Sequence, residues 1–288
     1  MNTTELISAI KIKGSFPTSN DLFSDADYLV LLNMVMNVEI NPLMLKLNDE
    51  YLLQSKDFTI AVGSTYRLPT RIISIRDLKI VDASGNLTDL DRCFEEDRAS
   101  GKRGYYIVRN SIELSSDFTT GTLRIKYFAR GSKLVLPADC GQVSSINTAT
   151  NTIVLVSAPT TFANGTLIDM VQNSNPYDLM SLDQAISSVA GTTLTFASLP
   201  ADLAVNDWIC ISNQSPVPMA PEEMHTVLVQ GALVSSLAAK KDKAAKDEKA
   251  YFEEMKAAVI NMLDPRVNNS SVKMRSGLIH NYFTNGRY

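Results

Sequence analysis

A long segment without Lys or Arg divides this chain of 288 residues. Between Lys133 and Lys240 the sequence contains no fixed cation, although it contains six Asp, two Glu and one His. The remainder of the chain has slightly more basic than acidic residues. Because a segment without cations cannot hold a phosphate or a carboxylate by charge, we expect it to form an acidic block set inside a more ordinary charged protein.

The block contains two similar stretches, offset by 41 to 43 residues. The first comprises VSSI (143–146), TIVL (152–155), Pro159 and NGTLI (164–168). The second comprises ISSV (186–189), TLTF (193–196), Pro200 and NDWI (206–209). Each copy predicts a hairpin, a loop that contains proline and a third strand. Since two copies are too few for a solenoid, we expect residues 137–216 to form an inserted all-β module, a barrel or sandwich, with a twofold internal repeat.

Before the block, the spacing of apolar residues changes once, from a helical period to a period of two. Residues 1–55 predict helices, because apolar residues recur every three or four positions and Ser24-Asp25-Ala26-Asp27 resembles a capping box. Pro42 is expected in the first turn of a further helix. Residues 56–136 alternate with a period of two, which indicates a central β-meander. Its predicted tight turns are Ser84-Gly85-Asn86 and Arg109-Asn110.

The sequence after the block is helical again. Residues 217–266 carry an apolar face, followed by i,i+4 pairs of opposite charge between Lys240 and Glu254. Two helices joined near Lys241 and one long bent helix both fit this pattern. Because neither terminal set of helices alone would make a closed core, we expect the two sets to pack on each other. The predicted fold is therefore α+β, with a helical core from the N- and C-terminal segments.

The last segment, residues 267–288, has no acidic residue and no helical periodicity. It combines basic with apolar and aromatic side chains, namely Lys273, Arg275, Leu278, Ile279, Tyr282, Phe283, Arg287 and Tyr288. Because aromatic and Arg side chains dominate binding hot spots, we expect an extended arm that docks on a neighbouring subunit or partner. A frayed terminus and an arm that binds nucleic acid are the alternatives, and three basic residues are few for the latter.

The sequence indicates no catalytic, cofactor-binding or metal-ligating residues. Motifs of zinc proteases, serine hydrolases and phosphate-binding loops are absent. Two histidines leave little room for metal or triad chemistry: we expect His225 to pack within the protein and His280 to contact a partner. The Asp residues of the block match no calcium loop, so turns and surface are their expected places. We therefore expect a protein that is not an enzyme and has no cofactor.

Membrane insertion and secretion are not indicated either. Apolar runs fall short of the roughly 20 residues that span a bilayer, and the first residues do not resemble a signal peptide. Three scattered cysteines, Cys93, Cys140 and Cys210, fit small buried thiols in a reducing compartment.

Several segments are together typical of one group of proteins. They are YRLPTR (66–71), RDLKIVD (76–82), GYYI (104–107), NSIEL (110–114), GTLRIKYF (121–128), PEEMH (221–225) and LVQGAL (228–233). This pattern resembles the head-to-tail connector (adaptor, or neck) proteins of tailed bacteriophages, and the resemblance covers most of residues 20–265.

The resemblance implies a structural virion protein that is assembled in the host cytoplasm and located in the neck. Such proteins form a homo-oligomeric ring, commonly of twelve copies. The ring binds the portal protein, continues the DNA channel and offers an attachment surface to a tail or nozzle protein. The C-terminal segment would reach the portal, and one helix would pack the copies into the ring through Leu228, Val229, Ala232, Leu233 and Leu237. The repeated β block departs from the smallest members of the family.

The charge pattern fits such a channel in one of two ways. Each Lys or Arg contact to passing DNA adds affinity and drag, so an acidic wall would let DNA pass without specific binding. An acidic block on the exterior would instead steer a basic partner.

Two other functions stay open from the sequence. One is a carbohydrate- or surface-binding β module on a helical stalk, as in a phage tail or adhesin, with Trp208 and Tyr177 as its candidate residues. The other is an enzyme that uses Asp169 and Asp207.

Overall fold

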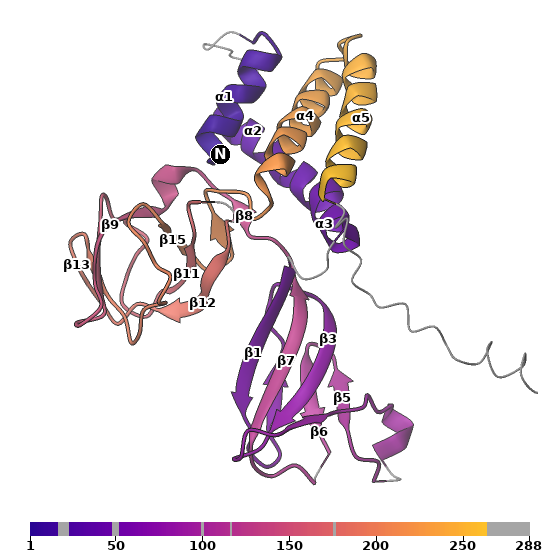
Figure 1. The fold of residues 1–288 in the computed structure, drawn as a ribbon, viewed down its shortest axis with the longest axis vertical. Coiled ribbons are helices and arrows are strands. Elements are labelled where there is room, and N and C mark those ends of the chain that lie inside the picture. Colours follow the sequence, from indigo (N-terminus) through magenta and orange to yellow (C-terminus); the bar gives the residue numbers. More distant parts are fainter. Residues whose placement is uncertain (17–22, 48–51, 99–100, 116, 175–176, 264–288) are drawn as a thin grey trace, which may run out of the picture.

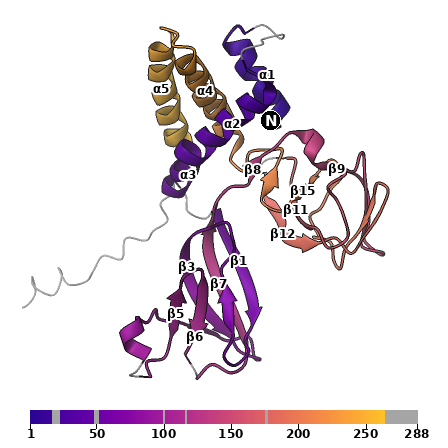
Figure 2. The same ribbon diagram turned by 180° about the vertical axis from the view of Figure 1, so that it is seen from behind.

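The computed structural model describes residues 1–16, 23–47, 52–98, 101–115, 117–174 and 177–263. These residues form a mixed α+β fold with helices and several antiparallel sheets. The helices gather at one end of the molecule, and two separate β units extend from them (Figure 1). The view from behind in Figure 2 has the same arrangement, with β1, β3, β5, β6 and β7 labelled in one unit and β9, β11, β12 and β15 in the other.

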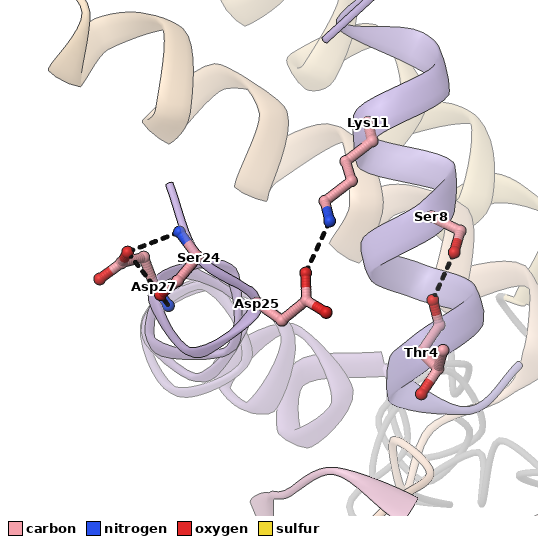
Figure 3. Close-up of polar contacts among 6 residues, drawn as sticks. All are labelled: Thr4, Ser8, Lys11, Ser24, Asp25 and Asp27. Carbon is pink, nitrogen blue, oxygen red and sulfur yellow. Dashed lines mark hydrogen bonds and ion pairs between the residues drawn. The ribbon is translucent and has the colours of Figure 1, made fainter. Parts of the chain in front are cut away.

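The helices come from both ends of the chain: α1 (Thr3–Lys13), α2 (Asp25–Val35), α3 (Asn41–Leu47), α4 (Glu222–Ala239) and α5 (Ala245–Leu263). The predicted capping box of α2 is confirmed, because the Asp27 N–H donates to Ser24 Oγ and the Ser24 N–H donates to the Asp27 carboxylate. Lys11 of α1 reaches Asp25 in an ion pair of 2.6 Å. Figure 3 draws these contacts: the capping box closes the start of α2, and the ion pair links it to α1.

Pro42 lies in the first turn of α3, as expected, but α3 is not separated from α2. A π-helical turn, η1 (Met36–Ile40), connects α2 directly to α3, so the chain stays helical from Asp25 to Leu47. Proline lacks the N–H that would bond the carbonyl one turn earlier, and a wider turn ahead of it accommodates the missing bond. The further helix therefore begins at a local change of helix type and continues from α2 without a break.

Buried side chains from all these helices form one cluster around α4. They include Leu6, Ile10, Tyr28, Leu32, Met36, Ile40, Val227, Leu228, Ala232, Leu233, Phe252 and Val259. At Gly231 the backbone of α4 lies close to side chains of α2 and α5, because a Cβ there would lie 2.6 Å from Val35 Cγ1 and 3.0 Å from Phe252 Cε2. The chain turns between α4 and α5 at Lys241, whose φ is +57°. Of the two arrangements that the sequence left open, the structure has two helices.

The first β unit contains β1 (Leu53–Thr59), β2 (Thr65–Arg67), β3 (Ile72–Val81), β4 (Leu87–Asp89), β5 (Tyr105–Val108), β6 (Ser111–Leu114) and β7 (Thr122–Ala129). Its sheets have the orders β1-β7-β3-β4 and β2-β6-β5. The meander prediction is wrong, because β7 lies between β1 and β3 instead of following its sequence neighbours. Both predicted turns are confirmed, since β3 pairs with β4 and β5 pairs with β6. The unit begins at Leu53, slightly before the predicted boundary, because β1 pairs along its whole length with β7.

The second β unit contains β9 (Gly141–Asn147), β10 (Thr152–Leu155), β11 (Leu167–Val171), β12 (Leu179–Ala185), β13 (Ser188–Ala190), β14 (Thr193–Thr195) and β15 (Trp208–Ile211). Its strands follow the order β12-β11-β15-β9-β10-β14-β13, and the neighbouring strands are antiparallel. The predicted hairpins are confirmed as β9–β10 and β13–β14. The strands at the two ends of this order, β12 and β13, are consecutive in the chain, with only Ile186 and Ser187 between them.

Short strands attach the second β unit to the helices. β8 (Lys133–Leu134) precedes the unit and β16 (Gln214–Ser215) follows it, and the two are parallel neighbours. The side chain of Asn33 on α2 donates to Leu134 O at 2.9 Å and accepts from Leu134 N at 2.8 Å. Thr3 of α1 donates its hydroxyl to Val135 O at 2.7 Å. The chain therefore enters and leaves the second β unit side by side, and α1 and α2 hold this place by hydrogen bonds.

Two 3-10 turns, η3 (Glu95–Arg98) and η4 (Pro137–Asp139), complete the regular elements.

Candidate functional site

The residues predicted to dock partners fall in two places. The arm residues Lys273, Arg275, Leu278, Ile279, Tyr282, Phe283, Arg287 and Tyr288 lie outside the described residues. The predicted ring-packing residues Leu228, Val229, Ala232, Leu233 and Leu237 are all buried in the helical cluster. Within one chain they pack against its own helices, and Val229 also lines a shallow groove at the surface beside Ile12.

The Asp residues of the block lie apart from one another in the fold, some buried and some exposed. Asp207 is buried, and its two carboxylate oxygens accept hydrogen bonds from Asn173 N at 2.9 Å and Ala204 N at 2.7 Å. Asp178 and Asp202 are exposed. In the part of the chain that the structure describes, no three His, Cys, Asp or Glu side chains come together in a group that could hold a metal.

His225 packs inside the protein, as predicted. Its Nδ1 lies 3.0 Å from the Met1 amine, its Nε2 lies 3.2 Å from Ala220 O, and the Tyr177 ring packs beside it with a centroid distance of 4.8 Å. Burial, with the charge of the N-terminal amine as a second cause, lowers the pKa of His225 to about 4. The imidazole is therefore neutral at pH 7 and holds the N-terminus against α4.

The aromatic residues proposed for sugar binding are covered. Trp208 is 7% exposed, and its indole Nε1–H donates to Asn173 Oδ1 at 2.8 Å. Tyr177 is also buried. Neither ring therefore presents a face on which a sugar could stack.

Burial raises the pKa of the Cys210 thiol well above its ordinary value, so this cysteine stays protonated and is a poor nucleophile.

A buried ion pair joins the two β units. Arg71, immediately before β3, places Nη2 2.6 Å from Asp169 Oδ2 on β11, and the side chains are 2% and 0% exposed. The same carboxylate accepts hydrogen bonds from Asp183 N at 3.0 Å and Asn213 N at 2.7 Å. A cation from outside the Lys- and Arg-free segment thus neutralises an acid inside it, and the acidic block is electrically linked to its neighbour.

An apolar stripe on α2 and η1 faces away from the core. Val30, Met34 and Val38 are 58%, 56% and 68% exposed, and their spacing of four residues places them on one side of the helix. Tyr28 and Leu32 on the other side are completely buried. This helix is therefore apolar on two sides, and the helical cluster uses only one of them.

A groove runs along the stripe between α2 and α5. It is lined by Met34, Val38, Gly231, Val234, Phe252 and Glu253, and it continues between α3 and α5. Lys256 bridges its two walls, with Nζ 2.9 Å from both Glu39 and Glu253. Partial burial disfavours the charge of Lys256, but the hydrogen bonds to both carboxylates outweigh this effect and raise its pKa. The groove therefore has an apolar floor and a charged rim whose shape is fixed by this bridge.

By length and composition alone, the helix Asp25–Leu47 could cross a membrane, with a mean hydropathy of 1.4. This differs from the sequence prediction, which considered uninterrupted apolar runs. The high value has a local explanation, because one side of the helix lies in the core and the other carries the stripe. A helix that is apolar on all sides is either buried or in contact with something else.

The sequence contained a signal for this surface that the predicted site residues missed. From Tyr28 to Val38 the chain has no charged residue, and its only polar side chains besides the Tyr28 hydroxyl are Asn33 and Asn37. Comparison with known proteins adds no identification: no protein-family model matches the chain, and no curated protein is similar to it.

Proposed function

We propose that this chain is a structural virion protein, a ring-forming head-to-tail adaptor that binds the portal protein, continues the DNA channel and provides the tail attachment surface. The observation that carries the proposal is the stripe of Val30, Met34 and Val38, since the other side of the same helix already belongs to a closed core. Apolar surface that a folded protein leaves uncovered marks a contact with another macromolecule. The resemblance to neck proteins supplies the identity of the partners.

In this proposal the helices from both chain ends form the body of the ring. Their shared buried cluster supports this role, because it joins the N-terminal and C-terminal segments into one rigid element. The two β units then project from the body, one for the tail protein and one for the channel or the exterior. Residues 267–288 form the extended arm that docks on the portal.

The second β unit is, in the same proposal, a duplicated three-stranded unit. Its pairing supports this, because β10 pairs with its counterpart β14 and β11 pairs with its counterpart β15. The pair Ile153–Leu194 lies at the repeat offset of 41 residues, and the neighbouring pairs are symmetric about it. The two end strands of the order, β12 and β13, are consecutive in the chain, which supports a closed barrel with a pseudo-twofold axis in this proposal.

Passage of DNA without specific binding fits the charges of this unit. Its exposed carboxylates include Asp139, Asp178 and Asp202, and the segment from 134 to 239 offers no cation of its own. Repulsion from the phosphates would keep DNA from adhering if the unit lines the channel. With the candidate rings Trp208 and Tyr177 buried, no observation favours the carbohydrate-binding function.

The test is the assembly state of the full chain, alone and mixed with the portal protein of the same phage. Native mass spectrometry and negative-stain electron microscopy should detect rings, with additional density on the portal in the mixture. A chain that stays monomeric in both samples would overturn the proposal.

A further inference from the structure

The helical cluster has a second uncovered apolar surface, on α1. Ile12 is 78% exposed and is the most exposed of the large apolar side chains in the described residues. Together with Met1, Ala9 and Lys13 of the first helical segment and Thr226 and Val229 of α4, it lines a shallow apolar groove. This surface, called here the Ile12 surface, shares no residue with the stripe or its groove.

The two surfaces lie on opposite sides of α4. Thr226 and Val229 belong to the Ile12 surface, whereas Gly231 and Val234, with Ser235, line the groove beside the stripe. At 3.6 residues per turn, the mean directions of these two sets differ by about 160°. One flat partner cannot cover both sides of the cluster, but two neighbours in a row can.

The N-terminal end of the stripe and the Ile12 surface carry opposite charges. α2 has Asp25 and Asp27 and no Lys or Arg, whereas Ile12 lies between Lys11 and Lys13. Farther along, Glu39 is paired with Lys256, and Lys46 and Lys249 also line the groove, so the acidic part of this face is its N-terminal end. Lys11 is already paired with Asp25 within the chain. Lys13, by contrast, donates to the neutral Gln230 Oε1 at 2.8 Å, so its charge can serve a second carboxylate. Asp27 precedes Val30 by three residues on the same side of α2, which places an acid at the end of the stripe.

We propose that the copies associate heterologously, with the Ile12 surface of one copy packed into the stripe and groove of the next. The inference rests on the proposed ring and names the two faces that form it. A contact between two different faces of the same chain repeats from copy to copy, and it closes into a ring when the rotation permits. Lys13 then approaches Asp27 at the N-terminal end of the neighbour's α2, which sets the direction of assembly.

Two single substitutions test the pairing in the full-length protein. Met34→Glu places a charge in the stripe, and Ile12→Glu places one in the Ile12 surface. Both side chains are exposed in one chain, so each variant should fold, and circular dichroism checks this. Val62→Glu, at a side chain that is 74% exposed on the first β unit, is the matched control and should assemble like the unmodified chain.

Mixing the variants distinguishes a heterologous contact from a symmetric one. Each variant alone should lose the ring species in native mass spectrometry. An equimolar mixture should give a heterodimer, because Met34→Glu keeps an intact Ile12 surface and Ile12→Glu keeps an intact stripe. The heterodimer cannot grow, since its two remaining faces both carry a charge.

Each other outcome overturns the inference. Homodimers of either variant would mean that like faces pair with each other. Rings formed by both variants would mean that the stripe is covered by something else, such as the segment 264–288 or a portal segment, and would leave the adaptor function intact. Failure of the unmodified chain to assemble, alone or with the portal, would overturn the proposed function as well.

Discussion

The buried ion pair between Arg71 and Asp169 gives a quantitative test of how the two β units are joined. Arg71→Met keeps an unbranched side chain and removes the guanidinium. Asp169 would then stay fully buried with two backbone N–H donors, from Asp183 and Asn213. Removal of one partner from a buried pair costs about 3–5 kcal/mol, because the remaining charge is uncompensated. We expect the free energy of unfolding to fall by that amount.

An exposed pair in the same protein is the control. Arg124 and Asp57 form a salt bridge of 2.7 Å between side chains that are 37% and 44% exposed. Because water screens this pair, Arg124→Met should cost far less stability than Arg71→Met. Urea titration followed by the fluorescence of Trp208, the sole tryptophan, measures both variants and reports on the second β unit.

A double-mutant cycle separates the pair from other effects. Asp169→Asn alone should also destabilise the protein, because the Arg71 guanidinium would become a buried unpaired cation. The double variant Arg71→Met/Asp169→Asn should be more stable than the sum of the two single effects predicts. Additive effects, or a cost for Arg71→Met no larger than that for Arg124→Met, would refute the reasoning.

Three further predictions concern single residues. The pKa of His225 is near 6.5 in the unfolded state and about 4 in the folded state, so the unfolded state binds more protons between these pH values. The free energy of unfolding should therefore fall by up to about 3 kcal/mol as the pH drops from 6.5 through 4. His225→Gln should flatten this part of a stability-against-pH curve. Gly231→Ala should lower the melting temperature despite the higher helix propensity of Ala, because overpacking against Val35 and Phe252 costs about 1–3 kcal/mol; a stabilised variant would contradict the packing. The emission of Trp208 should be blue-shifted and resist iodide quenching in the folded protein, and ready quenching would show that the ring is accessible to a ligand.

Local features were predictable because they depend on neighbouring residues. The Ser24–Asp27 capping box and the turns near Gly85 and Asn110 need only a few side chains in the right order, and all of them form as expected. The hairpins of the second β unit follow from alternating residues around short turns in the same way.

Long-range features were not predictable from one sequence. The pairing of β7 with both β1 and β3 depends on which strands meet in space, and period-two patterns do not encode that choice. Arg71 and Asp169 are 98 residues apart, and nothing in either neighbourhood points to the other. The absence of cations in one segment suggested an independent acidic block, yet its most buried acid, Asp169, depends on Arg71 of the first β unit.

The fixed joint between the β units matters for the proposed adaptor. Asn33 holds the start of the second β unit on α2, and Arg71 holds the middle of the same unit on the first. Two attachments to different parts of the molecule fix an orientation, whereas one would act as a hinge. Both uncovered apolar surfaces lie on the helices, so ring contacts through Ile12 and Met34 would leave the β units free. A ring built in this way would present every β unit at the same angle, as a regular attachment surface for a symmetric tail requires.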